Sequence, residues 1–186
     1  MQPAPVEFKK TLRKALLETR RNMATDERFR FDQEIGRQVS LYLHSTPFKT
    51  IGVYLPIQSE PDLSALYTEL SARMHLSLPV TIAKDQPLQF VKWKPGDRLV
   101  RGAYNVSVPE IQEPVDMPEV LLIPCVGYTT SRFRLGYGGG FFDRTLARYP
   151  QTHTVGIAYS CLLTDFSTEE NDIPLQCIIT ETGIML

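Results

Sequence analysis

The first 45 residues carry apolar side chains at helical spacing, with many charged residues between them. A basic amphipathic helix is predicted over residues 6–23, with one side that carries Phe8, Leu12, Ala15, Leu16 and Met23. A second helix is predicted over about 26–44, with apolar positions that include Ile35, Val39 and Tyr42. Because only one side of each segment is apolar, we expect that side to pack on the rest of the domain.

After residue 45 the pattern changes to short apolar runs separated by polar turns. TIGVYLP (50–56) is typical of a short strand closed by proline, whereas PDLSALYTELSARM (61–74) predicts a helix face made of Leu63, Leu66, Leu70 and Met74. GGFFDRTLARY (139–149) predicts another helix. Further strands are predicted at LSLPVTI (76–82), LQFVKW (88–93), EVLLIP (119–124), HTVGIAY (153–159) and QCIIT (176–180).

Strands that alternate with helices favour an α/β fold whose sheet is covered on both faces. We therefore predict a three-layer α/β/α domain around a central, mostly parallel sheet. With 186 residues the chain can bury one substantial core, so we expect a single domain over 1–186, with the basic helical segment 6–45 packed on the sheet. Ligands bind such sheets at loops that leave the carboxyl ends of strands. Two of these loops carry chemistry, PIQSEPD (56–62) and the segment 124–140.

Composition and charge argue against several classes of protein. The chain is 42% hydrophobic and 22% charged, as in a typical globular protein, and its formal net charge is −1. That charge argues against a nucleic-acid binder with a broad basic surface, and no apolar run approaches the roughly 18 residues of a membrane span. The opening MQPAPVEFKK lacks the apolar core of a secretory signal. Three cysteines without metal-type spacing indicate reduced thiols rather than zinc, so we expect a cytoplasmic protein without nucleic-acid or membrane partners.

The segment RFRLGYGGGFFDR (132–144) concentrates glycine in one place. Four of the chain's eleven glycines lie within five positions there, and arginines flank them. Such a cluster allows tight bends and close approach of the backbone to a ligand, although it can also be an ordinary loop. Because it opens a predicted helix after a strand, its unobstructed backbone N–H groups favour a phosphate site. It matches neither the Walker A loop, since no Lys-Ser/Thr pair follows, nor the GxGxxG pattern.

RLGYGGGFFDR, preceded by the strand LIPCVGY, closely resembles the ATP-binding loop of 5-formyltetrahydrofolate cyclo-ligases, whose usual form is RLGYGGGYYDR. Weaker matches lie in the family's order along nearly the whole chain: KKTLR, YLPIQSEPD, WKPGD with a following glycine and aromatic residue, and NDIPLQCIIT. The sequence departs from the family at Phe141 and Phe142, which replace two tyrosines, and at NVSVPE (105–110), which replaces a GIPEP-like segment. Neither departure removes a group that the chemistry requires.

The resemblance implies ATP-dependent cyclisation of 5-formyltetrahydrofolate to 5,10-methenyltetrahydrofolate, with release of ADP and phosphate. Phosphorylation of the formyl oxygen would make it a good leaving group, and N10 would then close the ring within the same molecule. The resemblance also implies a fold similar to that of sugar-phosphate isomerases, a monomer, Mg²⁺ as cofactor and ATP as co-substrate. Two alternatives stay open: a folate or nucleotide sensor without turnover, and an ATP-dependent enzyme that acts on another N-formyl or amide substrate.

The resemblance also implies roles for individual residues. For ATP binding it implies Lys9, Arg13, Arg134, Leu135, Gly136, Tyr137, Gly138, Gly139, Gly140, Phe141 and Phe142. For binding of the folate it implies Leu55, Glu60, Tyr104 and Phe141. For Mg²⁺ it implies Asp143 and Asp172.

Plainer interpretations of these residues stay open when the sequence is taken alone. Lys9 and Arg13 are four apart and share a helix face, which could be a solvated basic surface. Glu60 could cap the helix that follows it. Asp143 could be a first-turn carboxylate that interacts with the helix dipole, and Asp172 could be a turn residue before a proline.

Overall fold

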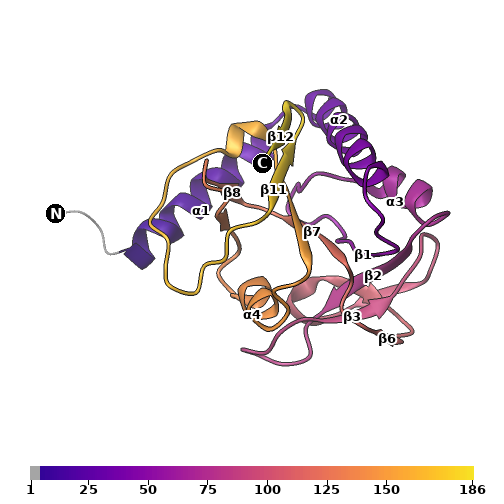
Figure 1. The fold of residues 1–186 in the computed structure, drawn as a ribbon. Coiled ribbons are helices and arrows are strands. Elements are labelled where there is room, and N and C mark those ends of the chain that lie inside the picture. The colour runs from indigo at the N-terminus through magenta and orange to yellow at the C-terminus, as the bar shows by residue number, and fades with distance from the viewer. Residues whose placement is uncertain (1–4) are drawn as a thin grey trace.

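The computed structural model describes residues 5–186 of the chain (Figure 1). Within this range the chain forms four α-helices and two short 3₁₀ helices: α1 (Pro5–Asn22), α2 (Thr25–His44), α3 (Ser64–Leu70), α4 (Phe141–Arg148), η1 (Ala103–Asn105) and η2 (Ser160–Leu162). The strands are β1 (Thr50–Gly52), β2 (His75–Val80), β3 (Gln89–Lys92), β4 (Leu99–Arg101), β5 (Ser107–Pro109), β6 (Pro114–Val115), β7 (Val120–Pro124), β8 (Gly127–Tyr128), β9 (Arg134–Leu135), β10 (His153–Ile157), β11 (Cys177–Thr180) and β12 (Gly183–Met185). Each helix and strand expected from the sequence has a counterpart here, although β1 ends at Gly52, before the proline that was expected to close it.

One eight-stranded sheet forms the centre of the fold, in the order β12-β11-β10-β7-β1-β2-β3-β6. Its middle strands from β11 to β2 run parallel, whereas the strands at both edges are antiparallel to their neighbours. At the centre, β7 pairs with β10 from Val120↔His153 to Pro124↔Ile157. Two small antiparallel pairs, β4–β5 and β8–β9, lie outside this sheet. The predicted α/β fold with a large, mostly parallel sheet is therefore confirmed.

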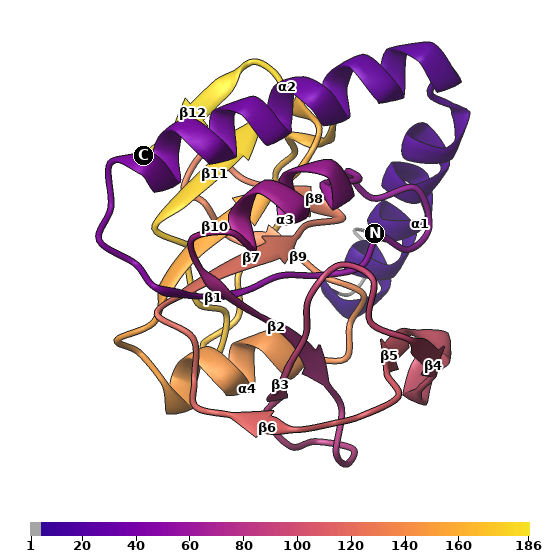
Figure 2. The same cartoon turned by 90° about the vertical axis from the view of Figure 1, so that its right-hand side faces the viewer.

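Helices lie on both faces of this sheet (Figure 2). On one face, α2 packs on β11 and β12, and α3 packs on β2. On the opposite face lies α4, where the hydroxyl of Thr145 accepts a hydrogen bond of 2.9 Å from the backbone N–H of Leu88. α1 lies beyond the carboxyl end of β7, so close to the chain that a Cβ at Gly127 would come within 2.6 Å of Leu16. The first helix therefore covers the edge of the sheet where parallel sheets bind ligands.

The two helices on one face bury the apolar positions that their sequence spacing predicts. In α2 the buried residues are Ile35, Val39 and Leu43, one helical turn apart from each other, while Tyr42 is only partly buried. In and around α3 the buried residues include Leu63, Leu66, Leu70 and Met74, as expected. Burial of an aliphatic side chain stabilises a fold by roughly 1.5–3 kcal/mol, so these two stripes hold the helices on the sheet.

The buried face of α1 differs from the prediction. Phe8, expected on the apolar side, is 41% exposed, and Ala15 is also exposed. Of the other expected positions, Leu16 is buried and Leu12 and Met23 are partly buried, but Lys9 and Arg20 are buried as well. The reason is that α1 packs partly on the hydrophobic core and partly covers a cavity, so its inward face also carries cations with ligands of their own.

The structure also shows the state of the cysteines and the character of the helices. Cys125, Cys161 and Cys177 are free thiols. Among residues 5–186, no helix has both the length and the apolar character that crossing a membrane would require. The predicted single domain over 1–186 includes residues 1–4, which lie outside the described residues, and its extent stays a prediction.

Candidate active site at the carboxyl ends of the sheet

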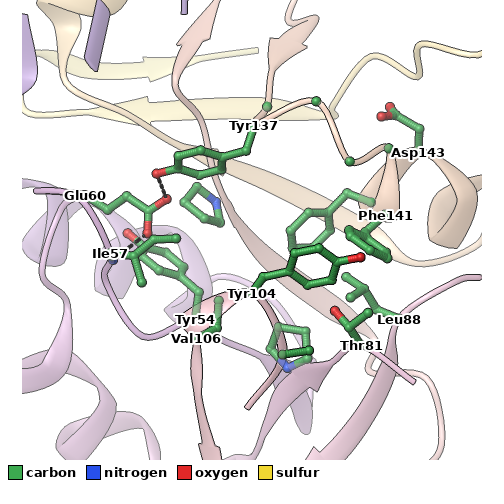
Figure 3. Close-up of a pocket in the computed structure, with 18 of the residues that line it drawn as sticks. Tyr54, Ile57, Glu60, Thr81, Leu88, Tyr104, Val106, Tyr137, Phe141 and Asp143 are labelled. Carbon is green, nitrogen blue, oxygen red and sulfur yellow. Dashed lines mark hydrogen bonds between the residues drawn. The ribbon is translucent and has the colours of Figure 1, made fainter. Parts of the chain in front are cut away.

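A cavity of about 870 Å³ opens at the carboxyl ends of β1, β2 and β7 (Figure 3). Its lining comes from α1, the loop after β1, the β4–β5 hairpin, the loop before α4 and the loop before β11. All residues for which the sequence predicted a site role line this one cavity: Lys9, Arg13, Leu55, Glu60, Tyr104, Arg134, Leu135, Gly136, Tyr137, Gly138, Gly139, Gly140, Phe141, Phe142, Asp143 and Asp172. The fold thus brings together segments that are more than 160 positions apart, as the 163-residue separation of Lys9 and Asp172 illustrates.

The glycine loop, residues 134–140, needs glycine at two of its positions for conformational reasons. Gly138 has φ of 94° and Gly140 has φ of 64°, and L-residues with a side chain rarely adopt such values. Gly140 is the N-cap of α4, so the first-turn N–H groups of that helix border the cavity directly after the loop. Arg144 holds the loop from the helix side, because its Nη2 donates a 2.5 Å hydrogen bond to the carbonyl of Gly139. This arrangement is suited to an anion.

Arg134, the first residue of the loop, is a buried cation. Its Nη2 lies 2.9 Å from Oδ2 of Asp143, and its guanidinium lies 5.6 Å from the ring centre of Phe142. Its Nη1 is buried and has no hydrogen-bond partner among the described residues. A buried, unsatisfied guanidinium donor costs about 1–3 kcal/mol or more, so this atom is best explained by an anionic ligand in the cavity.

Two further cations come from α1. Nζ of Lys9 lies 2.8 Å from Glu169 and 3.0 Å from Asp172, and the side chain is buried. Burial alone would lower the pKa of Lys9, but its hydrogen bonds to these two carboxylates raise that pKa above its ordinary value. Nε of Arg13 donates a 2.7 Å hydrogen bond to the carbonyl of Gly136. Lys9 and Arg13 are therefore part of the cavity wall, and a merely solvated basic face is ruled out for both.

The other half of the cavity is mainly apolar. Its wall contains Tyr54, Leu55, Leu78, Leu88, Val106 and Val108. The ring of Tyr104 lies edge-on to that of Phe141, with ring centres 5.3 Å apart (Figure 3). Tyr104 is nevertheless 63% exposed and has φ of 53°, so its ring borders the open side of the cavity. Two aromatic rings beside an aliphatic wall suit a flat, partly apolar ligand.

Glu60 is a buried carboxylate in this apolar half, with only 3% of its surface exposed. Its Oε2 accepts a 2.9 Å hydrogen bond from the N–H of Ile57, and its Oε1 accepts one of 2.7 Å from the hydroxyl of Tyr137 (Figure 3). Burial raises the pKa of Glu60, and these hydrogen bonds and the charge of Arg20 counteract that rise. The alternative role as a helix cap is wrong, since the N-cap of α3 is Leu63 without a side-chain cap bond.

For Asp143 and Asp172, both the local structural role and the proposed metal role stay open. Asp143 lies in the first turn of α4 and also forms the ion pair with Arg134. Asp172 closes a local turn, because its Oδ2 accepts a 2.9 Å hydrogen bond from the N–H of Glu169, and it also pairs with Lys9. Each carboxylate therefore lies beside a cation at the cavity wall.

Within the described part of the chain, the two acids are not part of a ready-made metal cage. Among residues 5–186, no group of three or more His, Cys, Asp or Glu side chains is arranged to hold a metal. Mg²⁺ in nucleotide sites is usually bound by one or two carboxylates together with phosphate and water oxygens, so a complete protein cage is not required. Asp143 and Asp172, which both line the cavity, are therefore candidate ligands only for a metal that arrives with phosphates.

Three side chains near the cavity were missed in the sequence. Arg20 is fully buried and reaches the turn after β1 and the glycine loop, Glu169 pairs with Lys9, and Arg144 holds Gly139. For Arg20 the sequence contains one indication, since this residue lies seven positions after Arg13 and hence on the same helix face. For Glu169 the sequence contains no such indication, since this residue lies in an acidic loop that would ordinarily be solvated.

A glycine loop that opens a helix, cations around it and an apolar wall with one buried carboxylate define a nucleotide-dependent α/β enzyme with a flat co-substrate. Comparison with known proteins makes this class specific. A sequence model of the 5-formyltetrahydrofolate cyclo-ligase family matches residues 5–181. The chain belongs to that family.

Individual relatives agree with this assignment. The chain is 30% identical over 182 residues to the 5-formyltetrahydrofolate cyclo-ligase of Escherichia coli (strain K12), an alignment that covers 91% of this chain and 98% of the relative. Among solved structures, it is similar to a 5,10-methenyltetrahydrofolate synthetase from Mycoplasma pneumoniae, with a TM-score of 0.78, 27% identity and coverage of 93% and 98% of the two chains. It is also similar to the 5,10-methenyltetrahydrofolate synthetase of Aquifex aeolicus, with a TM-score of 0.79, 29% identity and coverage of 95% and 91%.

Proposed function

We propose that this protein uses ATP to cyclise 5-formyltetrahydrofolate to 5,10-methenyltetrahydrofolate, with release of ADP and phosphate. The observation that carries the proposal is the single cavity in which a cationic glycine loop faces an apolar wall with one buried carboxylate. A phosphoryl donor and a pterin need these two different environments within reach of one another. Membership of the cyclo-ligase family supports the same reaction, and nothing favours a sensor without turnover or a different amide substrate.

The reaction has two parts, and the cavity is suited to both. The formyl oxygen attacks the γ-phosphorus, the bond to the β-phosphate oxygen breaks, and ADP leaves. N10 then attacks the activated formyl carbon and loses its proton, and the C–O bond to phosphate breaks as the methenyl bridge forms. Since both steps depend on alignment and on dispersal of charge, the protein's main task is to position the two substrates.

On the nucleotide side, we assign phosphate binding to the glycine loop and to three cations. Arg134 has a buried guanidinium atom that finds no hydrogen-bond partner within residues 5–186, and Lys9 and Arg13 extend the positive wall from α1. Phosphate oxygens would replace the acids and carbonyls that these cations contact now. The remaining loop residues, from Leu135 to Phe142, would enclose the nucleotide by backbone and ring contacts.

On the folate side, Glu60 would accept hydrogen bonds from the amino-pyrimidine N–H donors of the pterin. An ionised carboxyl group has about four lone-pair sites, and two of those in Glu60 are occupied by Ile57 and Tyr137. Leu55 would supply part of the apolar wall, and Tyr104 and Phe141 would stack on the rings. Most of Tyr104 is exposed, so contact with a substrate would remove apolar surface from water.

Magnesium is part of the proposal as a partner of ATP. Asp143 and Asp172 would hold it, and when bound it would neutralise charge on the phosphates. We also propose that the protein is a cytoplasmic monomer that binds neither nucleic acid nor membranes, which its free thiols and near-neutral net charge support. Its likeness to sugar-phosphate isomerases stays a prediction about the fold.

One assay tests the function directly. Purified protein is mixed with MgATP and 5-formyltetrahydrofolate, and the methenyl chromophore and ADP are followed together. We expect both products in equal amounts, and neither when one substrate is omitted. Folded protein that binds both substrates without turnover would indicate a sensor. ADP release with other N-formyl compounds, but not with the folate, would indicate a different substrate.

A further inference from the structure

Arg20 is the largest buried side chain that the roles assigned above leave unexplained. It comes from α1 and has no exposed surface. Its Nε donates a 2.9 Å hydrogen bond to the carbonyl of Gln58, and its Nη2 donates one of 2.6 Å to the hydroxyl of Tyr137. Its Nη1 lies 3.5 Å from the carbonyl of Cys125, just after β7. One guanidinium thus touches the loop after β1, the end of a central strand and the glycine loop.

The loop that Arg20 holds is strained. Residues 57–60 form a turn closed by a 2.9 Å hydrogen bond from the N–H of Glu60 to the carbonyl of Ile57. The two central residues, Gln58 and Ser59, have φ of 47° and 62°, as in a type I′ turn, where glycine or asparagine is usual. Residues held in such conformations cost on the order of 1–3 kcal/mol each and persist where surrounding contacts fix them. Arg20 supplies one such contact, at the carbonyl of the first strained residue.

The same turn presents Glu60 to the cavity, and Tyr137 links it back to Arg20. The hydroxyl of Tyr137 accepts a hydrogen bond from Arg20 and donates its proton to Glu60, so it acts as acceptor and donor at once. Tyr137 belongs to the glycine loop between Gly136 and Gly138. A partly buried chain of hydrogen bonds therefore joins α1, the glycine loop and the acid of the 57–60 turn.

We propose that Arg20 is a positioning residue that couples the two substrate sites through the hydroxyl of Tyr137. A pterin bound to Glu60 fixes the carboxylate, the carboxylate fixes the hydroxyl, and the hydroxyl fixes the glycine loop in the form that receives phosphates. Folate binding then increases nucleotide affinity, and by linkage nucleotide binding increases folate affinity by the same factor. This inference rests on the proposed function and names a residue beyond those that touch the substrates.

The coupling can be measured as a ratio, namely the affinity for an ATP analogue with the folate bound divided by its affinity without the folate. The affinity for a non-hydrolysable ATP analogue with Mg²⁺ is determined by titration calorimetry without folate and with saturating 5-formyltetrahydrofolate. We expect the folate to tighten binding of the analogue by about tenfold in the natural protein, within the usual range for coupled sites. In Tyr137→Phe the ring remains and only the hydroxyl is lost, and we expect the ratio to fall to about one. A ratio cancels any uniform loss of affinity, so it separates coupling from damage to the loop.

Arg20→Lys separates geometry from charge. Lysine keeps the positive charge near Glu60 but lacks the planar fork that reaches Gln58 and Tyr137 together, so we expect its ratio to fall toward one as well. Tyr159→Phe is the matched control, because the hydroxyl of Tyr159 likewise donates a short hydrogen bond, of 2.6 Å, to a carboxylate, that of Asp32, outside the cavity. Its ratio should equal that of the natural protein.

The outcomes are distinct. An unchanged ratio in Tyr137→Phe, or a ratio of one in the natural protein when both ligands bind, overturns the coupling and leaves the proposed function intact. Failure of the folded natural protein to bind either ligand overturns the proposed function, and the coupling with it. If Arg20→Lys does not fold, Tyr137→Phe still decides, since it retains the bonds of Arg20 to Gln58 and Cys125.

Discussion

The two halves of the cavity satisfy their charged groups in different ways. The nucleotide half is the part around the glycine loop and α1 to which we assign ATP. There each cation is held by a group of the protein that a phosphate could replace: Lys9 by Glu169 and Asp172, Arg134 by Asp143, and Arg13 by the carbonyl of Gly136. The folate half is the apolar part of the cavity around Glu60, to which we assign the folate. Glu60 is buried there, and the N–H of Ile57 and the hydroxyl of Tyr137 hold its carboxylate in place. The first half is built of exchangeable ion pairs, and the second is preorganised.

This difference follows from what each ligand brings. ATP carries several negative charges, so it can displace the acids and leave them for a metal ion. A pterin carries neutral N–H donors and a large flat surface, so its site must have an acceptor oriented in advance and a dry wall. Variants in the nucleotide half should therefore change salt and metal dependence, whereas variants in the folate half should change substrate affinity and stability.

The largest effect is expected for Asp143→Asn. Asparagine keeps the shape and can remain in the first turn of α4, but it loses the charge that pairs with Arg134 and that would bind Mg²⁺. A metal on transferring phosphates contributes several kcal/mol to the transition state, so turnover should fall by roughly two to four powers of ten. The measurement is the rate of methenyl formation at several Mg²⁺ concentrations, and raised Mg²⁺ should recover part of the rate.

Asp62→Asn is the control, because Asp62 is an exposed acid just before α3 and outside the cavity. It should keep its turnover. Normal rates for Asp143→Asn at limiting Mg²⁺ would leave Asp143 with only its ion pair and its helix position, and would contradict the metal assignment.

A smaller effect is expected for Arg134→Ala. A charge-assisted hydrogen bond contributes about 1.5–3 kcal/mol, so KM for ATP should rise by roughly ten- to a hundredfold. KM for the folate should change much less, because this side chain lies in the nucleotide half. Arg148→Ala, at an exposed arginine at the end of α4 and outside the cavity, is the matched control. Equal weakening of both substrates would mean that the two halves are not separable at Arg134.

Glu60→Gln tests the preorganised half. It should weaken folate binding by about 1–3 kcal/mol, roughly five- to a hundredfold, because an amide cannot accept at both of its positions. Direct binding of the folate, measured by calorimetry, checks this loss. Unchanged folate affinity would return Glu60 to a purely structural role.

The same variant has a predicted pH dependence. Burial raises the pKa of Glu60, so the folded state binds more protons than the unfolded state between the ordinary pKa and the raised one. The contribution of Glu60 to stability is therefore greatest below its ordinary pKa and is lost as pH rises through the raised pKa. As the pH rises from 4 to 7, the melting temperature of Glu60→Gln should therefore increase relative to that of the natural protein, which thermal unfolding measures. Glu119→Gln should show the opposite trend at lower pH, because backbone hydrogen bonds lower the pKa of Glu119 and its contribution to stability is lost as pH falls from its ordinary pKa through the lowered one.

Local patterns in the sequence predicted much of the fold and the cavity. The face of α3 and the glycine loop depend on residues a few positions apart, so periodicity and a motif were enough to find them. The buried cations of α1 could not be found in this way, because their partners are distant in the sequence. Arg20 binds residues that are 38, 105 and 117 positions away, and Lys9 binds an acid 160 positions away. A helix that covers a cavity can bury cations beside its apolar side chains, and the spacing of apolar residues does not show this.

The smallest effect is expected for Glu169→Gln, and it has the opposite sign. Glu169 holds Lys9 at 2.8 Å, and it is 60% exposed while Lys9 is 8% exposed, as measured on the side chains. If ATP must displace this acid, its removal should strengthen nucleotide binding. A partly exposed ion pair contributes about 0.2–1 kcal/mol, so the affinity for ATP should rise by no more than about fivefold. The gain should shrink at high salt, since salt screens the competing pair.

Binding of the ATP analogue at low and high salt measures this gain. Glu170→Gln, a neighbouring exposed acid outside the cavity, should leave the affinity unchanged. Weaker binding in Glu169→Gln would mean that this acid supports the nucleotide rather than competing with it, for example as a further ligand for its metal. The nucleotide half would then be preorganised as well, and the contrast between the halves would be one of charge alone.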